Sequence, residues 1–128
     1  MRVYVADAHA LAYYLVDRLP RESDKVFREA ESHSCEIVIP SIAVAELIYL
    51  FEKTGTKNRI WELFEKIDSY PSFRISPLDE ELLKVILEID LPDLHDRIIV
   101  GTCRLLKADG LITRDASIKS SGLVKTIW

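Results

Sequence analysis

The chain has 128 residues, of which 48% are apolar and 30% are charged, and this composition is ordinary for one folded globular domain. The formal net charge of −4 excludes a protein that relies on a large basic surface. No segment approaches the roughly 18 apolar residues of a membrane span, and two cysteines do not make a disulfide framework. We therefore expect a single cytoplasmic domain over residues 1–128, with reduced thiols and no signal peptide before its first strand.

Short apolar runs alternate with longer amphipathic stretches in the first half of the chain. In chain order, these runs predict a strand over residues 2–6, helices over 8–16 and 23–32, a strand over 37–39, and helices over 42–53 and 58–69. Ser41 is well placed to cap the helix over 42–53, which is apolar on nearly every side. Such a helix is usually buried all round, so a second chain could cover part of it.

The alternation continues in the second half of the chain. It predicts, in order, a strand over residues 73–75, a helix from 77 to about 89, a helix over 96–107, a strand over 111–113, a short helix or loop over 114–121 and a strand over 123–127. Ser76 is expected to cap the first of these helices, with Pro77 at its first position. The full order predicts an α/β domain with a mainly parallel sheet of about five strands.

Four carboxylates lie in or beside apolar segments, where an uncompensated charge is costly. They are Asp7 after the first strand, Glu46 inside the apolar helix, Asp96 at the start of the helix over 96–107, and Asp115 after the strand over 111–113. Ligands of parallel sheets gather beyond the carboxyl ends of the strands, so one edge of the sheet could collect all four side chains. Their joint placement suggests one shared compensator, and a divalent metal is the simplest candidate.

Each of these acids also has a purely structural explanation. Asp7 and Asp96 could cap the helices that follow them, Asp115 could belong to a turn, and Glu46 could form a salt bridge. Hard cations such as Mg²⁺ and Mn²⁺, however, prefer carboxylate oxygens and water, and two such ions can flank a phosphodiester during hydrolysis. The pattern therefore favours an acidic metal site of the kind that nucleases use.

With these residues in hand, the chain resembles the PIN-domain ribonucleases and, within them, the VapC toxins of bacterial and archaeal toxin–antitoxin pairs. The resemblance rests on four motifs: an aspartate that ends the first strand (residues 5–11), a glutamate in a helix after Pro-Ser (39–47), an aspartate near a helix start (94–102), and Thr-Arg-Asp after a strand (111–115). Each motif alone is permissive. Four in this order, at family-like spacing over essentially the whole chain, are fairly specific.

The resemblance implies a three-layer α/β/α sandwich, Mg²⁺ or Mn²⁺ as cofactor, and hydrolysis of RNA phosphodiester bonds. It assigns the catalytic and metal-binding roles to Asp7, Glu46, Asp96 and Asp115, with a supporting hydroxyl from Thr113. It also implies a VapB-like antitoxin partner and a homodimer. Two departures, which remove no ligand, are Ala8-His9 in place of Thr or Ser-Asn-like residues and Gly101-Thr102-Cys103 in place of Ala-Thr-Ala, where close helix packing could require the glycine.

Candidate contacts with RNA and with partner proteins are less sharply marked. Arg97 and Arg114 adjoin proposed metal ligands and could bind phosphates, whereas Lys53, Lys57 and Arg59 could make a more distant contact or form a solvated turn. No ladder of aromatic and basic residues indicates base stacking. The candidates for partner surfaces, which could equally fill the core of the protein itself, are Tyr13, Tyr14, Leu47, Ile48, Phe51 and Trp61.

Three other functions remain open. A phosphatase with Asp7 as nucleophile normally has a second aspartate two residues later, where this chain has His9. A non-catalytic PIN-like binding module would be expected to lack some of the acids, and all four are present. An RNA-processing nuclease without an antitoxin would share the whole site.

Overall fold

Five parallel strands form one central sheet in the computed structural model, which describes all of residues 1–128. The strands are β1 (Arg2–Ala6), β2 (Cys35–Pro40), β3 (Phe73–Ser76), β4 (Gly110–Ile112) and β5 (Thr126–Ile127). Their order across the sheet is β3-β2-β1-β4-β5, and every neighbouring pair is parallel. The predicted parallel α/β sheet is therefore confirmed, with β1 at its centre.

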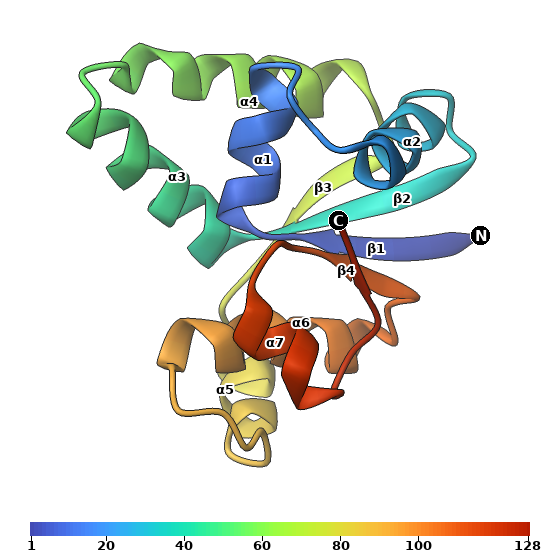
Figure 1. The fold of residues 1–128 in the computed structure, drawn as a ribbon, viewed down its shortest axis with the longest axis vertical. Helices are drawn as coiled ribbons and strands as arrows, with labels where there is room; N and C mark the ends of the chain where they lie inside the picture. Colours follow the sequence, from blue (N-terminus) through green and yellow to red (C-terminus); the bar gives the residue numbers. More distant parts are fainter.

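Helices cover both faces of this sheet (Figure 1). One face carries α1 (Ala8–Leu15), α2 (Arg21–Glu31), α3 (Ser41–Lys53) and α4 (Ile60–Ser69), with a 3₁₀ turn at Lys57–Arg59 before α4; the other carries α5 (Glu80–Ile86), α6 (Leu94–Leu106) and α7 (Ala116–Ser121). This is the predicted three-layer sandwich. No helix has both the length and the apolar character needed to cross a membrane.

The central strands are apolar on both sides because helices bury both faces of the sheet. Val5 in β1, Val38 in β2 and Leu111 in β4 are all 0% exposed. From the upper layer, Leu11 of α1 and Leu47 of α3 are also fully buried. This continuous core fixes the positions where the strands end, and so fixes the edge at which the candidate site lies.

Part of the predicted partner surface belongs to this core instead. Tyr14, Leu47 and Phe51 are 5%, 0% and 8% exposed, so for these three residues the structure confirms the alternative that they fill the protein's own core, and excludes a partner surface. Tyr14 stacks on Phe27 with ring centroids 4.3 Å apart, and its hydroxyl donates a 2.5 Å hydrogen bond to Glu31. Burial, together with this bond to a carboxylate, raises the pKa of Tyr14, which stays neutral and joins α1 to α2.

Two predicted helix caps are also wrong. Ser41 is the first residue of α3, which follows Pro40 without a side-chain cap. Ser76 does not open a helix, because it pairs with Pro40 as the last residue of β3. The cap of α5 is instead Asp79, whose Oδ1 accepts a 3.0 Å hydrogen bond from the Leu82 amide.

Other element boundaries differ by a few residues. The α6 helix begins at Leu94, two residues earlier than predicted, because Asp93 caps it through the Asp96 amide at 3.0 Å. The α5 helix ends at Ile86, and the last strand is confined to Thr126–Ile127. These changes leave the layer order intact.

Candidate active site

The candidate site lies where β1 and β4 end side by side at the centre of the sheet. The crossover direction changes at this pair of strands, which makes it the switch point where parallel sheets usually bind ligands. Asp7 directly follows β1, and Thr113 directly follows β4. A 3.2 Å hydrogen bond from the Asp7 amide to the Ile112 carbonyl holds the two strand ends together.

Asp7 combines the structural role and the site role that its position suggested. Its Oδ1 caps α1 by accepting a 2.9 Å hydrogen bond from the Ala10 amide, and its Oδ2 accepts a bond from the Thr113 hydroxyl. Burial raises the pKa of Asp7, although the bonds from Thr113 and Ala10 oppose that effect. Thr113 is only 2% exposed, so it acts through Asp7 from beneath the site.

Asp115 caps α7 with a single carboxylate oxygen. Its Oδ1 accepts hydrogen bonds from the amides of Ser117 and Ile118 at 2.9 and 3.0 Å, and from the Ser117 hydroxyl at 2.6 Å. These donors favour the ionised form, and the Ser117 hydroxyl contributes most to the lowered pKa of Asp115. The other carboxylate oxygen remains available to a ligand.

Asp96 lies in the first turn of α6, and Asp93 rather than Asp96 caps that helix. Burial is the main cause of the raised pKa of Asp96, followed by the negative charge of Asp115. The Ser117 hydroxyl lies 3.3 Å from Asp96 Oδ2 and 2.6 Å from Asp115 Oδ1, so this one serine links the two acids. Ser117 was missed in the sequence, where its only signal is a serine two residues after a helix-capping aspartate.

Glu46 is half-buried on α3 and has a histidine as its nearest ionic partner. His95 Nε2 lies 3.9 Å from Glu46 Oε1, and the pair is ionic only when His95 is protonated. Burial raises the pKa of Glu46, and the neighbouring His95 partly offsets that effect. The salt bridge considered for Glu46 is thus a weak one to histidine. No lysine or arginine forms a salt bridge with any of the four acids.

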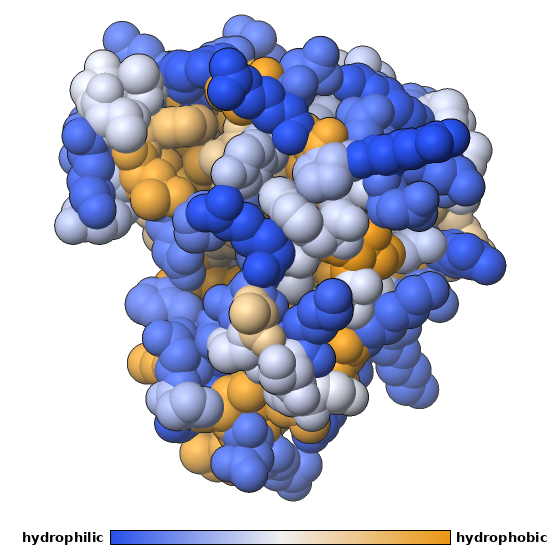
Figure 2. Space-filling model, in the orientation of Figure 1, coloured by the Kyte–Doolittle hydropathy of each residue, from blue (hydrophilic) through white to orange (hydrophobic).

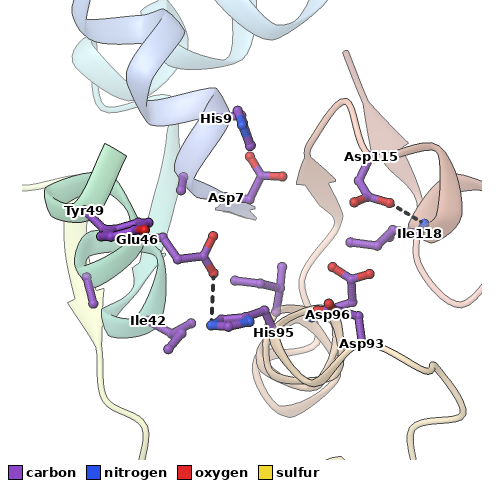
Figure 3. Close-up of a pocket in the computed structure, with 13 residues that line it drawn as sticks. Asp7, His9, Ile42, Glu46, Tyr49, Asp93, His95, Asp96, Asp115 and Ile118 are labelled. Atoms are coloured by element: carbon purple, nitrogen blue, oxygen red, sulfur yellow. Dashed lines mark hydrogen bonds and ion pairs between the residues drawn. The ribbon is translucent and has the colours of Figure 1, made fainter. Parts of the chain in front are cut away.

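All four carboxylates line one open cavity of about 500 Å³ (Figure 3). Asp7 and Glu46 lie on one side, facing Asp96 and Asp115 across the gap, and His9 and His95 stand at its edges. No three of these side chains lie close enough together to form a compact group of metal ligands. The donor set fits a hard divalent cation nonetheless, because it is made of carboxylate oxygens whose charges no lysine or arginine neutralises.

The two arginines predicted to bind substrate make contacts within the protein. Arg97 donates to the carbonyls of Leu91 and Pro92, at 2.5 and 3.2 Å, and so fixes the loop before α6. Arg114 donates a 2.8 Å hydrogen bond to the Tyr13 hydroxyl and lies over the Tyr13 ring. Neither lines the cavity in this conformation. A contact of either arginine with phosphate stays a prediction.

Several solved structures share this fold over nearly the whole chain. A VapBC2 complex from Rickettsia felis bound to a promoter DNA fragment has a TM-score of 0.75 at 16% identity, covering 98% of this chain and 97% of the other. A DNA-bound VapBC from Salmonella typhimurium has a TM-score of 0.74 at 16% identity, covering 99% and 98%. The Mycobacterium tuberculosis toxin VapC20, which cleaves the sarcin–ricin loop, has a TM-score of 0.70 at 11% identity, covering 95% and 97%.

Sequence comparison gives the family more directly than these distant structures, which establish the fold. No curated protein matches the sequence significantly. The sequence profile of the PIN domain matches residues 4–121 and spans all four acids of the cavity. The chain therefore belongs to the PIN domain family.

Proposed function

We propose that this protein is a metal-dependent endoribonuclease whose metal site is built by Asp7, Glu46, Asp96 and Asp115. The observation that carries the proposal is the meeting of these four carboxylates, from four separate segments, in one cavity without a lysine or arginine partner. Membership of the PIN family supports a nuclease. Structural likeness to a toxin that cleaves the sarcin–ricin loop supports RNA as the substrate class.

The roles of the residues follow from their surroundings. Asp7 and Asp96 would be the principal metal ligands, and Glu46 and Asp115 would complete the site directly or through water. Bound Mg²⁺ or Mn²⁺ would supply an activated water and stabilise the leaving oxygen, which gives 5′-phosphate and 3′-hydroxyl ends. Thr113 holds Asp7 in place, and Ser117 holds Asp115 next to Asp96. These two hydroxyls would keep the ligands oriented when metal binding displaces protons from the carboxylates into the solvent.

The proposal extends to a toxin–antitoxin pair in the cytoplasm, with residues 1–128 acting as one PIN domain. The VapBC complexes among the similar structures support a VapB-like antitoxin as partner. Apolar side chains gather on the surface between α1 and α3 (Figure 2). Trp61, on the neighbouring α4, is also exposed. Such a surface suits an amphipathic segment of a partner or a second copy in a homodimer.

Cleavage of total cellular RNA tests the catalytic part of this proposal. Wild-type protein is expected to produce discrete 5′-phosphate ends with Mn²⁺ and none with EDTA, whereas Asp96→Asn is expected to lose this cleavage. Asp79→Asn is a matched control, because it makes the same change at a helix cap outside the cavity. Full metal-dependent cleavage by Asp96→Asn would contradict the assignment of the site.

A further inference from the structure

One face of α3 carries a row of side chains that begins in the carboxylate cavity and continues beyond it. Ile42, Glu46 and Tyr49 line the cavity, and Lys53 follows one turn later. Spacings of four, three and four residues place these side chains above one another on the same helix face. An acid, an aromatic ring and a cation therefore follow one another away from the proposed metal site.

Tyr49 is the one large hydrophobic residue of α3 that is exposed to solvent. Its side chain is 63% exposed, whereas Leu47 and Phe51 on the same helix are 0% and 8% exposed. Ala45 lies one turn earlier and offers only a methyl group beside the ring, and Figure 3 shows Tyr49 next to Glu46 at the wall of the cavity. The Lys53 ammonium lies 5.5 Å from the centre of the Tyr49 ring. An exposed ring thus stands between an acidic cavity and a cation.

We propose, on the basis of the proposed nuclease function, that Tyr49 and Lys53 form a subsite for single-stranded nucleic acid. An unpaired base would stack on the Tyr49 ring, and the adjoining phosphate would contact Lys53. Stacking on an aromatic side chain is tolerant of sequence, because every base has a π-face. The bases of a duplex are already stacked on one another, so this subsite selects a single strand.

Charge favours this occupant over a protein partner at the same ring. Free carboxylates in the cavity repel phosphate, so a strand that crosses the site needs cationic contacts beside it. Lys53 supplies such a contact on the α3 side of the cavity, and Lys57, also exposed, follows it along the chain. An apolar protein partner would gain nothing from a lysine held over the ring.

Binding can be measured separately from cleavage in the Asp96→Asn background. The probe is a short fluorescein-labelled single-stranded RNA of mixed sequence, followed by fluorescence anisotropy, with duplex RNA and single-stranded DNA as parallel probes. Tyr49→Ala is expected to weaken single-strand binding by about 5- to 150-fold, and Tyr49→Phe to leave it nearly unchanged. Lys53→Gln is expected to reduce the slope of log affinity against log salt by about 0.7.

The matched control is Trp61→Ala, which removes an aromatic side chain that is 64% exposed but does not line the cavity. It is expected to bind RNA like the parent, and the duplex is expected to bind more weakly than either single strand. The proposal is overturned if Tyr49→Ala binds like the parent, if duplex and single strand bind equally, or if the parent binds no probe. A changed sedimentation mass of Tyr49→Ala with unchanged RNA affinity would assign the ring to a protein interface instead.

Cleavage by the wild-type protein separates this inference from the proposed function. If the protein cleaves total RNA but its RNA binding does not depend on Tyr49, the subsite is contradicted and the nuclease function is supported. If RNA binding depends on Tyr49 but the protein cleaves no RNA, the subsite is supported and the nuclease function is contradicted.

Discussion

Thr113 connects two of the proposed metal ligands through one buried hydroxyl group. It donates a hydrogen bond to Asp7 Oδ2 and accepts one from the Asp115 amide at 3.0 Å. Its side chain is only 2% exposed, so water does not replace either bond when the hydroxyl is lost. A buried polar group without a partner costs about 1–3 kcal/mol of stability. Loss of the Thr113 hydroxyl would leave both the Asp7 carboxylate and the Asp115 amide without this partner, and so would disturb the positions of both acids.

Thr113→Val is expected to lower Mn²⁺ affinity or RNA cleavage by about 10- to 100-fold, the usual effect of losing a residue that orients a metal ligand. Titration calorimetry with Mn²⁺ and initial cleavage rates would measure it. Thr113→Ser keeps the hydroxyl and should retain most of the activity. Thr102→Val is the control, because Thr102 is also 2% exposed and donates its hydroxyl to the Ile98 carbonyl outside the cavity. Equal activity in the two valine variants would show that Thr113 has no special role.

At the scale of single residues, the sequence predicted the four acids and, through the family resemblance, the supporting hydroxyl of Thr113, but it did not predict Ser117. Asp7, Glu46, Asp96 and Asp115 stood out because charge in an apolar segment needs compensation. Ser117 gave no such signal, because an exposed serine after an aspartate is common in turns. Its link to Asp96 depends on α6 and α7 meeting at the cavity, which local sequence does not encode.

The close packing of α5 against α6 depends on Gly101. A Cβ atom at Gly101 of α6 would lie 3.0 Å from Ile86 Cγ2 and 3.2 Å from Leu82 Cδ1, both on α5. Glycine inside a helix costs up to about 1 kcal/mol relative to alanine. Close approach of the two helices explains why the chain has Gly101 where the family more usually has alanine.

Gly101→Val is expected to lower the free energy of unfolding by about 1–3 kcal/mol, because its side chain would overpack the α5–α6 contact. Gly101→Ala should cost less, since the gain in helix propensity offsets part of the overlap. Urea denaturation followed by circular dichroism would give both values. If the valine variant has the wild-type urea midpoint, α5 can move away from α6 without any loss of stability, which would contradict this account of Gly101.

The type and order of the elements followed from the sequence, whereas their caps depended on tertiary contacts. Continuous apolar runs identified β1 and β2 because helices bury both faces of the sheet. Ser76 looked like a helix cap, but pairing with Pro40 extends β3 through it, so Asp79 caps α5 instead. Local propensity cannot predict that a residue will join a strand through pairing with a neighbouring strand.

The whole molecule brings distant segments to one edge of the sheet. Parallel strands place all their carboxyl ends together, so the meeting of Asp7 and Asp115 was predictable from the alternation of strands and helices. The directions of other side chains were not predictable, because they depend on contacts between layers. Thus Glu46 faces His95, Arg97 binds the loop before α6, and Tyr49 stays exposed on a helix that looked apolar throughout.

The buried carboxylates of the cavity make the stability of the metal-free protein depend on pH. Burial raises the pKa of Asp7 above its ordinary value, and it does the same for Glu46 and Asp96. The folded, metal-free protein therefore holds these protons more tightly than the unfolded chain, whose aspartates titrate at about 3.9. Stability from this source is present below that ordinary pKa and is lost as pH rises through the raised values. At neutral pH these three ionised acids, unlike Asp115, destabilise the metal-free fold.

The most direct test of whether these carboxylates form a metal site is thermal unfolding at neutral pH. Wild-type protein and Asp7→Asn are each unfolded with EDTA and with Mn²⁺. Asparagine keeps an oxygen to cap α1 and removes a buried charge, although it loses the oxygen that accepts the bond from Thr113. Because burial outweighs that bond in the pKa of Asp7, Asp7→Asn is expected to have the higher Tm in EDTA. Mn²⁺ should stabilise the wild type by about 2.7 kcal/mol at 100 times its Kd and Asp7→Asn far less, which reverses the order. Asp79→Asn should respond to Mn²⁺ like the wild type. An equal Mn²⁺ response in wild type and Asp7→Asn would contradict a metal site built on these carboxylates.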